Sequence, residues 1–308
     1  MTALLRRVGF WLRAARFEFF TGSLAPVLVG CAVAWWQTGR LSWPLALGTL
    51  VALVLLHASA NLANDYWDHL SGNDARNRSF VRPFTGGSRF IQRGQVRPRA
   101  VLAASLLCLA GGAALGFVLV WLRGWPILVL GVVGGLSGFF YTARPVALGY
   151  RGLGELFIAL DFGVLPVLGA YYVQAQAFSW PAGAASLPVA LLISAILWIN
   201  QFPDYAADLA VGKRHWVVRL GRRRAAVVYA GMMTLTYVLL LASVAVELLP
   251  PLVLLAALAL PLLARGIDVA LREYDHPRRL APANAATIAL HLACSVLVTL
   301  GLVLDRLL

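Results

Sequence analysis

The chain has 308 residues, of which 60% are hydrophobic and 13% are charged, and its mean hydropathy is +0.78. A soluble domain carries about 25% charged residues and a disordered chain has low hydrophobicity, so both classes are excluded. Three cysteines without metal-binding spacing exclude a disulfide scaffold and a structural zinc site. We therefore expect an all-α, polytopic membrane protein. The net charge of +13 then indicates topology and an anionic partner at the membrane face, and not nucleic acid.

Taken in chain order, the first expected element is a helix in the membrane interface over residues 1–19. Between Leu4 and Phe20, apolar residues recur at helical spacing with basic residues between them, a pattern typical of helices that lie in the plane of the membrane. Nine apolar stretches follow, and a membrane span needs about 20 such residues. We expect spans at residues 20–38, 44–63, 100–120, 125–141, 155–174, 183–201, 225–245, 248–265 and 284–305.

The distribution of Lys and Arg predicts the orientation of these spans. With the boundaries above, all of the 26 cations except Arg40, Arg123 and Arg306 lie on the same side as the N-terminus. Because Lys and Arg accumulate in cytoplasmic loops, we expect the N-terminus and the two long loops in the cytoplasm, with the chain (1–308) forming a single membrane domain. The long loops are expected at about residues 64–99 and 202–224.

Each of these two loops begins with a cluster of carboxylates at the end of an even-numbered span. The first cluster contains Asn64, Asp65 and Asp68, followed by Asp74, and the second contains Asn200, Asp204 and Asp208. Residues three or four positions apart share one face of a helix. Carboxylates are costly to bury together at a membrane boundary, and a divalent cation relieves that cost.

The composition of the two clusters indicates which cation and which substrate they bind. Hard oxygen ligands in this number suit Mg2+, which also binds phosphate oxygens. We therefore expect Mg2+ at Asn64, Asp65, Asp68, Asn200, Asp204 and Asp208. Cations that could bind a diphosphate follow each cluster; they are Arg76, Arg82, Arg89, Arg93, Lys213 and Arg214. Charged clusters over an apolar bundle suit a substrate with a charged head and a hydrocarbon tail, such as a polyprenyl diphosphate.

On these residues, the sequence resembles the UbiA superfamily of intramembrane prenyltransferases. Within it, the resemblance is to the 1,4-dihydroxy-2-naphthoate polyprenyltransferases of menaquinone biosynthesis. The Asn-Asp-x-x-Asp run with a further Asp matches Asn64 to Asp74, and Asp-x-x-x-Asp followed by Gly-Lys and Val-Arg-Leu-Gly matches Asp204 to Gly221. The resemblance runs from about residue 15 to residue 305. It implies nine transmembrane helices around a central cavity, Mg2+ as cofactor, and transfer of a prenyl group to an aromatic acceptor.

The reaction that the resemblance implies gives roles to particular residues. Asp68, Asp204 and Asp208 would act on the diphosphate through the metal, and Tyr141 would stabilise the allylic cation, with Tyr66, Tyr171 and Tyr172 behind it. Asp161 lies inside a predicted span, where a carboxylate suggests a functional site. It would orient or deprotonate the hydroxyl of the acceptor; the alternatives are a hydrogen-bonded core Asp or an ion pair with Arg144 or Arg151.

Several positions depart from the pattern of the superfamily and leave the acceptor open. Pro203 stands where Arg is frequent, and His215-Trp216 stands where Thr-Leu usually follows Gly-Lys-x. The alternatives to 1,4-dihydroxy-2-naphthoate are a 4-hydroxybenzoate-like compound or another aromatic acceptor. From a different class of protein, a membrane transporter is the remaining alternative, with the carboxylates forming an ion path.

Overall fold

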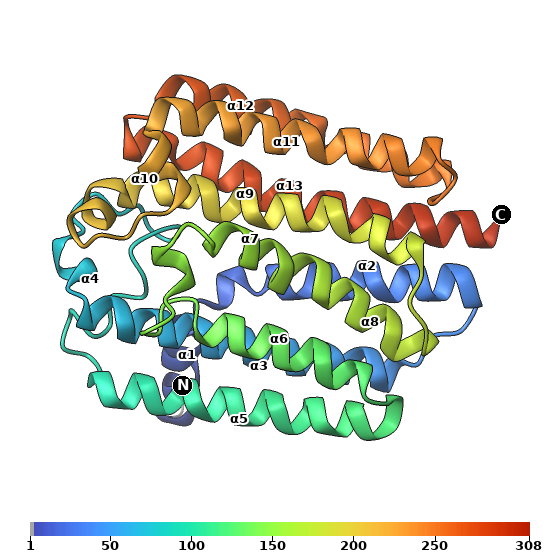
Figure 1. Cartoon of the computed structure of the whole chain (residues 1–308), viewed down its shortest axis with the longest axis horizontal. Helices are drawn as coiled ribbons and strands as arrows, with labels where there is room; N and C mark the ends of the chain where they lie inside the picture. The colour runs from blue at the N-terminus through green and yellow to red at the C-terminus, as the bar shows by residue number, and fades with distance from the viewer. Residues whose placement is uncertain (1–2) are drawn as a thin grey trace.

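The computed structural model describes residues 3–308, in which helices are joined by turns and loops and no strand occurs. Figure 1 shows an elongated bundle of roughly antiparallel helices, with the short helices α4 and α10 at one end. The first half comprises α1 (Ala3–Ala14), η1 (Phe17–Phe19), α2 (Thr21–Thr38), α3 (Trp43–Leu70), α4 (Asn73–Arg76), α5 (Pro98–Arg123), α6 (Pro126–Phe139) and η2 (Leu148–Tyr150). The second half comprises α7 (Gly154–Ala159), η3 (Leu160–Val164), α8 (Leu165–Ala175), α9 (Trp180–Ala210), α10 (Trp216–Leu220), α11 (Arg222–Ala245), η4 (Pro251–Ala259), α12 (Leu260–Glu273) and α13 (Pro277–Leu307).

The nine expected spans all correspond to helical segments, and eight of them are long and apolar enough to cross a membrane. The difference lies in the fourth span, where α6 has only 14 residues. At 1.5 Å per residue it is about 21 Å long, shorter than the ~30 Å hydrocarbon core. Trp125-Pro126 begins the helix, and Phe140 ends it before the short connection to η2. The protein is therefore an integral membrane protein whose described residues contain eight helices long enough to span the membrane and one shorter apolar helix, α6.

We call the two carboxylate clusters the Asp motifs, the first from Asn64 to Asp74 and the second from Asn200 to Asp208. The prediction that they lie in loops is wrong, because the helices α3 and α9 continue past the expected ends of their spans. Helix α3 runs to Leu70, since no residue interrupts it before Gly72, whose positive φ of 73° terminates the turn. Helix α9 continues through Pro203 to Ala210; this proline removes one backbone hydrogen bond without ending the helix. Asp65, Asp68, Asp204 and Asp208 are therefore held on rigid helical turns.

Helices α9 and α5 occupy contrasting places in the bundle. In the most apolar part of α9, 72% of the residues are buried, whereas the value for α5 is 17%. Helix α9 packs against α2, α7, α11 and α13, and the largest cluster of buried side chains is built around it. At Gly163 of η3 an added Cβ would lie 2.3 Å from the Cα of Ala190, so glycine permits the close contact of η3 with α9.

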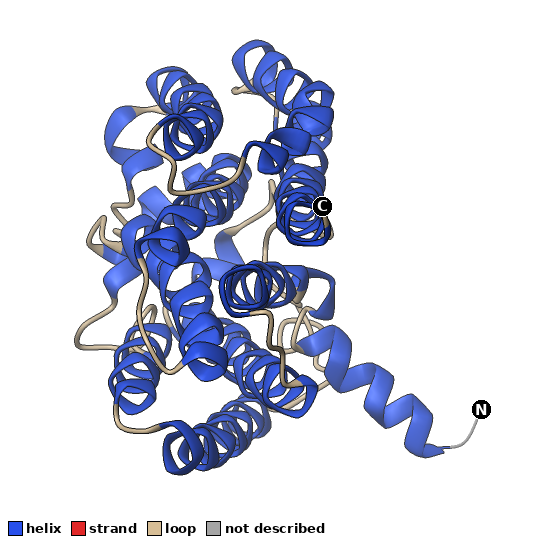
Figure 2. Ribbon diagram, turned by 90° about the vertical axis from the view of Figure 1, so that its right-hand side faces the viewer, coloured by secondary structure: helices blue, strands red, loops and turns tan. Residues whose placement is uncertain are grey.

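The N-terminal helix α1 projects from the side of the bundle, as Figure 2 shows. It carries exposed Leu5, Val8 and Leu12 as well as basic residues, which agrees with the amphipathic pattern expected of an interfacial helix. Phe10 stacks on Phe90 with 4.7 Å between ring centroids. This contact joins α1 to the long connection between α4 and α5.

Candidate active site

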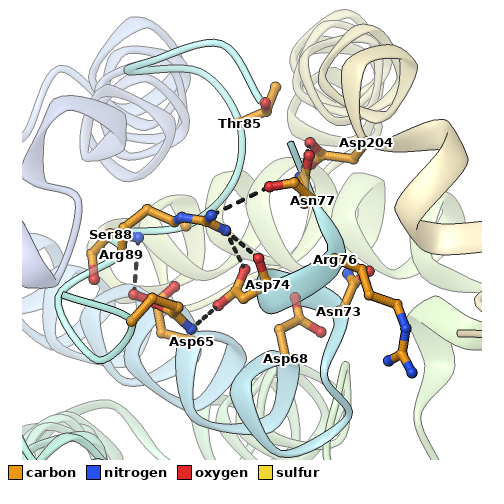
Figure 3. A network of polar contacts seen from close by, with 12 residues as sticks. Asp65, Asp68, Asn73, Asp74, Arg76, Asn77, Thr85, Ser88, Arg89 and Asp204 are labelled. Carbon is orange, nitrogen blue, oxygen red and sulfur yellow. Dashed lines mark hydrogen bonds and ion pairs between the residues drawn. The ribbon is translucent and has the colours of Figure 1, made fainter. Parts of the chain in front are cut away.

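The two Asp motifs face each other at one end of the bundle, with the connection after α3 folded over them. Figure 3 shows this end, where α4, with Asn73 and Asp74, and the residue after it, Asn77, lie between the motifs. The aspartates of the first motif come from α3, and those of the second come from α9. Residues more than 130 positions apart in the sequence are thereby brought into hydrogen-bond contact.

The first motif is held by an arginine and by a backbone amide. One carboxylate oxygen of Asp65, Oδ1, pairs with Arg16, and the other, Oδ2, accepts a hydrogen bond from the Ser88 backbone N–H at 3.0 Å. Gly87 is required here because its φ is 68° and an added Cβ would lie 2.8 Å from Asp65 Oδ1. Asp68 remains directed toward the second motif, and Asn64 donates to its Oδ2 at 3.1 Å.

The second motif is held mainly by neutral side chains. Asn77 donates to Asp204 Oδ1 at 2.6 Å, and Asn73 donates to Asp208 Oδ1 at 2.8 Å. His215 Nε2 lies 2.9 Å from Asp208 Oδ2, and its Nδ1 accepts from the Val218 N–H. The ring of His215 is completely buried and caps helix α10.

Lys213 links the two motifs. Its Nζ lies 3.7 Å from Asp68 Oδ2 and 3.6 Å from Asp208 Oδ1. Burial alone would lower the pKa of Lys213, but the carboxylates of Asp208 and Asp68 raise it well above its ordinary value. The ammonium group therefore stays charged and marks a point where positive charge is favoured between the two helices.

The donor set fits a magnesium ion that is shared with a phosphate ligand. In the part of the chain that the structure describes, no three Asp, Glu, His or Cys side chains approach closely enough to enclose a metal by themselves. Mg2+ does not require such a cage, because it keeps several waters and commonly binds one or two carboxylates together with substrate phosphates. The facing carboxylates of Asp68, Asp204 and Asp208 supply hard oxygen ligands of this kind. The amide oxygen of Asn200, by contrast, already accepts a hydrogen bond from Asn284 at 2.7 Å.

A cavity of about 210 Å³ extends from the motifs into the bundle, and we call it the head cavity. Its charged end contains Asp68, Asp204, Asp208, Lys213 and Arg16, and its inner walls contain Tyr141, Phe162, Ile193 and Ile196. Burial raises the pKa of Tyr141, which keeps this phenol neutral. Tyr66, Tyr171 and Tyr172 are not among the described residues that line the cavity. The cavity thus joins a charged end to an aromatic and aliphatic interior.

Asp161 lies on the inner wall of the head cavity, on the π-helical turn η3. Such turns interrupt regular helices and are frequent at functional sites. Its Oδ1 is 2.7 Å from Ser137 Oγ of α6. Of the expected alternatives, a hydrogen bond is therefore found; no ion pair of Asp161 with Arg144 or Arg151 occurs among residues 5–308.

Of the six cations expected to bind a diphosphate, Lys213 is the one that lines the head cavity among the described residues. Arg76, Arg82, Arg93 and Arg214 are exposed, and Figure 3 shows Arg76 directed away from the carboxylates. Arg82 donates to the Ser88 carbonyl, so it supports the loop. Arg89 holds α4 in place by donating to the carbonyls of Asp74 and Asn77.

In the sequence, Arg16 counts only among the cations that predict topology, yet the structure places it in the head cavity. Its Nη2 donates to Asn64 Oδ1 at 2.9 Å and pairs with Asp65. Asn73 and Asn77 were likewise missed, although they stand directly beside Asp74, on either side of it in the sequence. A second polar contact was also missed: Glu155 Oε1 accepts from Gln201 Nε2 at 3.1 Å and from the Trp216 N–H at 3.0 Å. No spacing signal connects Arg16 or Glu155 to the motifs, because the contacts join distant helices.

Comparison with known proteins places this site in a family. A model of the UbiA prenyltransferase family matches residues 23–300. The chain is 29% identical to 2-carboxy-1,4-naphthoquinone phytyltransferase of Synechocystis sp., covering 94% of this chain and 92% of that one. It is 32% identical to 1,4-dihydroxy-2-naphthoate octaprenyltransferase of Escherichia coli, covering 98% and 97%.

A solved UbiA homologue from Archaeoglobus fulgidus, bound to GPP and Mg2+, has the same fold. Its TM-score is 0.63 at 16% sequence identity, over 94% of this chain and 99% of that one. The family match covers most of the chain, so the transporter alternative is excluded. The chain belongs to the UbiA prenyltransferase family and is a membrane-embedded prenyltransferase.

Proposed function

We propose that the protein transfers a polyprenyl group from a prenyl diphosphate to 1,4-dihydroxy-2-naphthoate, in the presence of Mg2+, to give demethylmenaquinone in its reduced, quinol form. The observation that carries this proposal is the convergence of Asp68, Asp204 and Asp208 with Lys213 at the charged end of a cavity with an aromatic and aliphatic interior. The Synechocystis and E. coli relatives, both named for naphthoate-type acceptors, support the choice of acceptor. The orientation follows from the distribution of cations, with the motif end in the cytoplasm.

The residues around the diphosphate would bind it and stabilise it as a leaving group. Asp68, Asp204 and Asp208 would hold Mg2+, with Asn64, Asp65 and Asn200 around them. Bound there, the ion would neutralise charge on the diphosphate oxygens. Lys213 and Arg16 add positive charge from the protein, and they replace the exposed arginines in this role. Lys213 contributes as a point charge, and Arg16 offers a planar fork of donors.

The interior of the head cavity would then control the carbon chemistry. The C–O bond of the prenyl diphosphate breaks, a C–C bond to the aromatic ring forms, and the ring carboxylate leaves as carbon dioxide. Tyr141 faces the cavity and offers an electron-rich ring to the allylic cation. Asp161, fixed by Ser137, would accept a hydrogen bond from a hydroxyl of the acceptor and increase the electron density of its ring. The apolar walls exclude water, which would otherwise trap the cation.

The test is a prenyl-transfer assay with the purified protein in lipid vesicles. Geranyl and octaprenyl diphosphates would be offered with 1,4-dihydroxy-2-naphthoate or 4-hydroxybenzoate, with and without EDTA. We expect a prenylated naphthoate product that is lost on chelation and in Asp68→Ala and Asp204→Ala. Prenylation of 4-hydroxybenzoate alone would overturn the acceptor but not the family reaction. Transfer that persists with EDTA would overturn the metal site.

A further inference from the structure

The connection between α6 and α7, residues 140–153, lies at the same end of the bundle as α4 and α10 (Figure 1). It contributes Tyr141 to the head cavity, and it contains η2, which ends at Tyr150. Tyr150 belongs to neither Asp motif, is half-buried, and is not among the described residues that line the head cavity. It nevertheless contacts both motif regions, so it can influence the site from outside the cavity.

The hydroxyl of Tyr150 faces the first motif. It lies 3.2 Å from Asp68 Oδ1 and 3.1 Å from Ser71 Oγ, and it is the donor in both contacts. A phenol carries its proton at neutral pH, so it is able to donate. Asn64 donates to the other oxygen of Asp68, Oδ2, at 3.1 Å. Each oxygen of this carboxylate therefore has a donor that limits its rotation, and each retains a lone pair for a further ligand.

The backbone and the ring of Tyr150 face the second motif. The carbonyl oxygen of Tyr150 accepts a hydrogen bond from the Arg214 N–H at 3.0 Å. The Nζ of Lys213, the preceding residue, lies 5.6 Å from the centroid of the Tyr150 ring, within the range of a cation–π contact. The Lys213 N–H donates to the Asp208 carbonyl at 2.8 Å. The segment that carries Lys213 is thus held between Tyr150 and the end of α9.

Two further contacts fix this segment independently of the Tyr150 side chain. Arg219 Nη2 donates to the Arg151 carbonyl at 2.7 Å, and the Trp216 N–H donates to Glu155 Oε1 at 3.0 Å. Together with the Tyr150 carbonyl, these contacts would remain if the phenol hydroxyl alone were removed. Loss of the hydroxyl therefore isolates the contact with the first motif.

Tyr150 is thus a single residue that fixes Asp68 relative to Lys213. The ammonium of Lys213 in turn lies 3.6 Å from Asp208 Oδ1 of the second motif. The relative position of the carboxylates of the two motifs matters for a metal bound between them, because Mg2+ demands near-ideal octahedral geometry. A carboxylate that is free to rotate would meet this demand only part of the time.

We propose that Tyr150 is a positioning residue for the prenyl-transfer site, whose hydroxyl holds the Asp68 carboxylate in the orientation that binds the divalent cation together with the diphosphate. This inference rests on the proposed function, because it takes Asp68 as a ligand of that cation. Tyr150 acts through Asp68 and does not contact the substrate. Its hydroxyl therefore affects the affinity for the metal more than the rate of the chemical step.

The test measures metal affinity directly, with Mn2+ as a spectroscopic probe of the site. Purified protein in lipid nanodiscs would be titrated with Mn2+ and followed by electron paramagnetic resonance. Geranyl thiolodiphosphate, an unreactive analogue with sulfur in place of the bridging oxygen, would be present and the acceptor absent. We expect Tyr150→Phe to raise the Kd of Mn2+ by about tenfold, since removing a group that orients a metal ligand weakens binding by about 10–100-fold.

Tyr237→Phe is the matched control. The Tyr237 hydroxyl donates to the Ala256 carbonyl at 3.0 Å, and Tyr237 lies in α11 and is not among the described residues that line the head cavity. This variant loses one tyrosine hydrogen bond and should keep the Kd of Mn2+. An unchanged Kd in Tyr150→Phe would overturn the proposal even if fewer sites bind, because loss of folded protein lowers the number of sites and not their affinity.

Ser71→Ala separates the two partners of the Tyr150 hydroxyl. We expect Tyr150→Phe to raise the Kd of Mn2+ by a similar factor when Ser71 is already alanine. If the effect disappears in that background, the hydroxyl acts through the end of α3 and the proposed contact with Asp68 is overturned. A loss of kcat at saturating Mg2+ with an unchanged Kd would also overturn it. If the unmodified protein binds Mn2+ and the analogue but prenylates no acceptor, the proposed function fails, and the Mn2+ titrations still decide the role of Tyr150.

Discussion

The two Asp motifs have the same residue types on the last turns of two helices, yet the protein holds them differently. In the first motif, Asp65 forms an ion pair with Arg16 and accepts a hydrogen bond from the backbone N–H of Ser88. It therefore holds these two segments in place around the site. In the second motif, both aspartates line the head cavity and take hydrogen bonds from neutral amides. Motifs that are equivalent in sequence therefore have unequal surroundings: the first motif partly supports the structure, and the second is directed into the head cavity.

The largest predicted effect separates the two motifs directly. Asp204→Asn removes from the cavity a carboxylate that we propose to bind the metal, and we expect kcat/KM to fall by about 10³-fold, the range seen when one strong electrostatic contact to a transition state is lost. Asp65→Asn keeps a hydrogen-bond acceptor for Ser88, so its kcat/KM should fall by only about tenfold. Both would be measured in vesicles with saturating Mg2+. Equal losses in the two variants would contradict unequal roles for the motifs.

The second prediction concerns the cation between the motifs. Lys213→Gln removes the charge that contacts Asp68 and Asp208, and we expect kcat/KM to fall by about 10²-fold. Arg16→Gln removes a charge that contacts only the first motif. Its loss should be smaller and should appear mainly as a higher KM for the prenyl diphosphate. A larger loss in Arg16→Gln than in Lys213→Gln would reverse the assignment of the central cation.

The sequence predicts the helical fold and both motifs, because apolar length and carboxylate spacing are local signals. It misplaces the motifs in loops, since the end of an apolar stretch was taken as the end of a helix. Helix α3 ends seven residues after the expected end of its span, and helix α9 ends nine residues after it. Most of the cations predicted to bind the diphosphate do not line the head cavity, for a related reason. Charge near a motif in sequence does not decide whether a side chain points into the cavity, and Arg16 enters it from 48 residues away.

The third prediction tests the neutral amides that hold the second motif. Asn77 is the hydrogen-bond donor to Asp204, so Asn77→Ala should leave this carboxylate less well positioned for the metal. Removing such a supporting group typically weakens metal affinity by about 10–100-fold. We expect a higher Mg2+ concentration for half-maximal activity, with most of kcat recovered at saturating Mg2+. Ala75→Ser, on the exposed face of α4, is the matched control and should leave the Mg2+ titration in place. A loss of kcat that Mg2+ does not recover would show that Asn77 acts on the substrate instead.

The smallest predicted effect belongs to the exposed arginines beside the first motif. Arg76 is directed to solvent, and its guanidinium contacts the carbonyl of Gly72, one turn earlier in the chain. A charge in solvent at this distance from the carboxylates is screened by salt, so Arg76→Gln should change the KM for the prenyl diphosphate by no more than about twofold. The same holds for Arg93→Gln, since Arg93 is exposed as well. If either variant raised this KM as much as Lys213→Gln, the connection after α3 would have to close over the bound diphosphate. The arginines beside the first motif would then contact the diphosphate only when the substrate is bound. The two motifs would differ in when their cations come into contact with the substrate, and not in the structure without substrate.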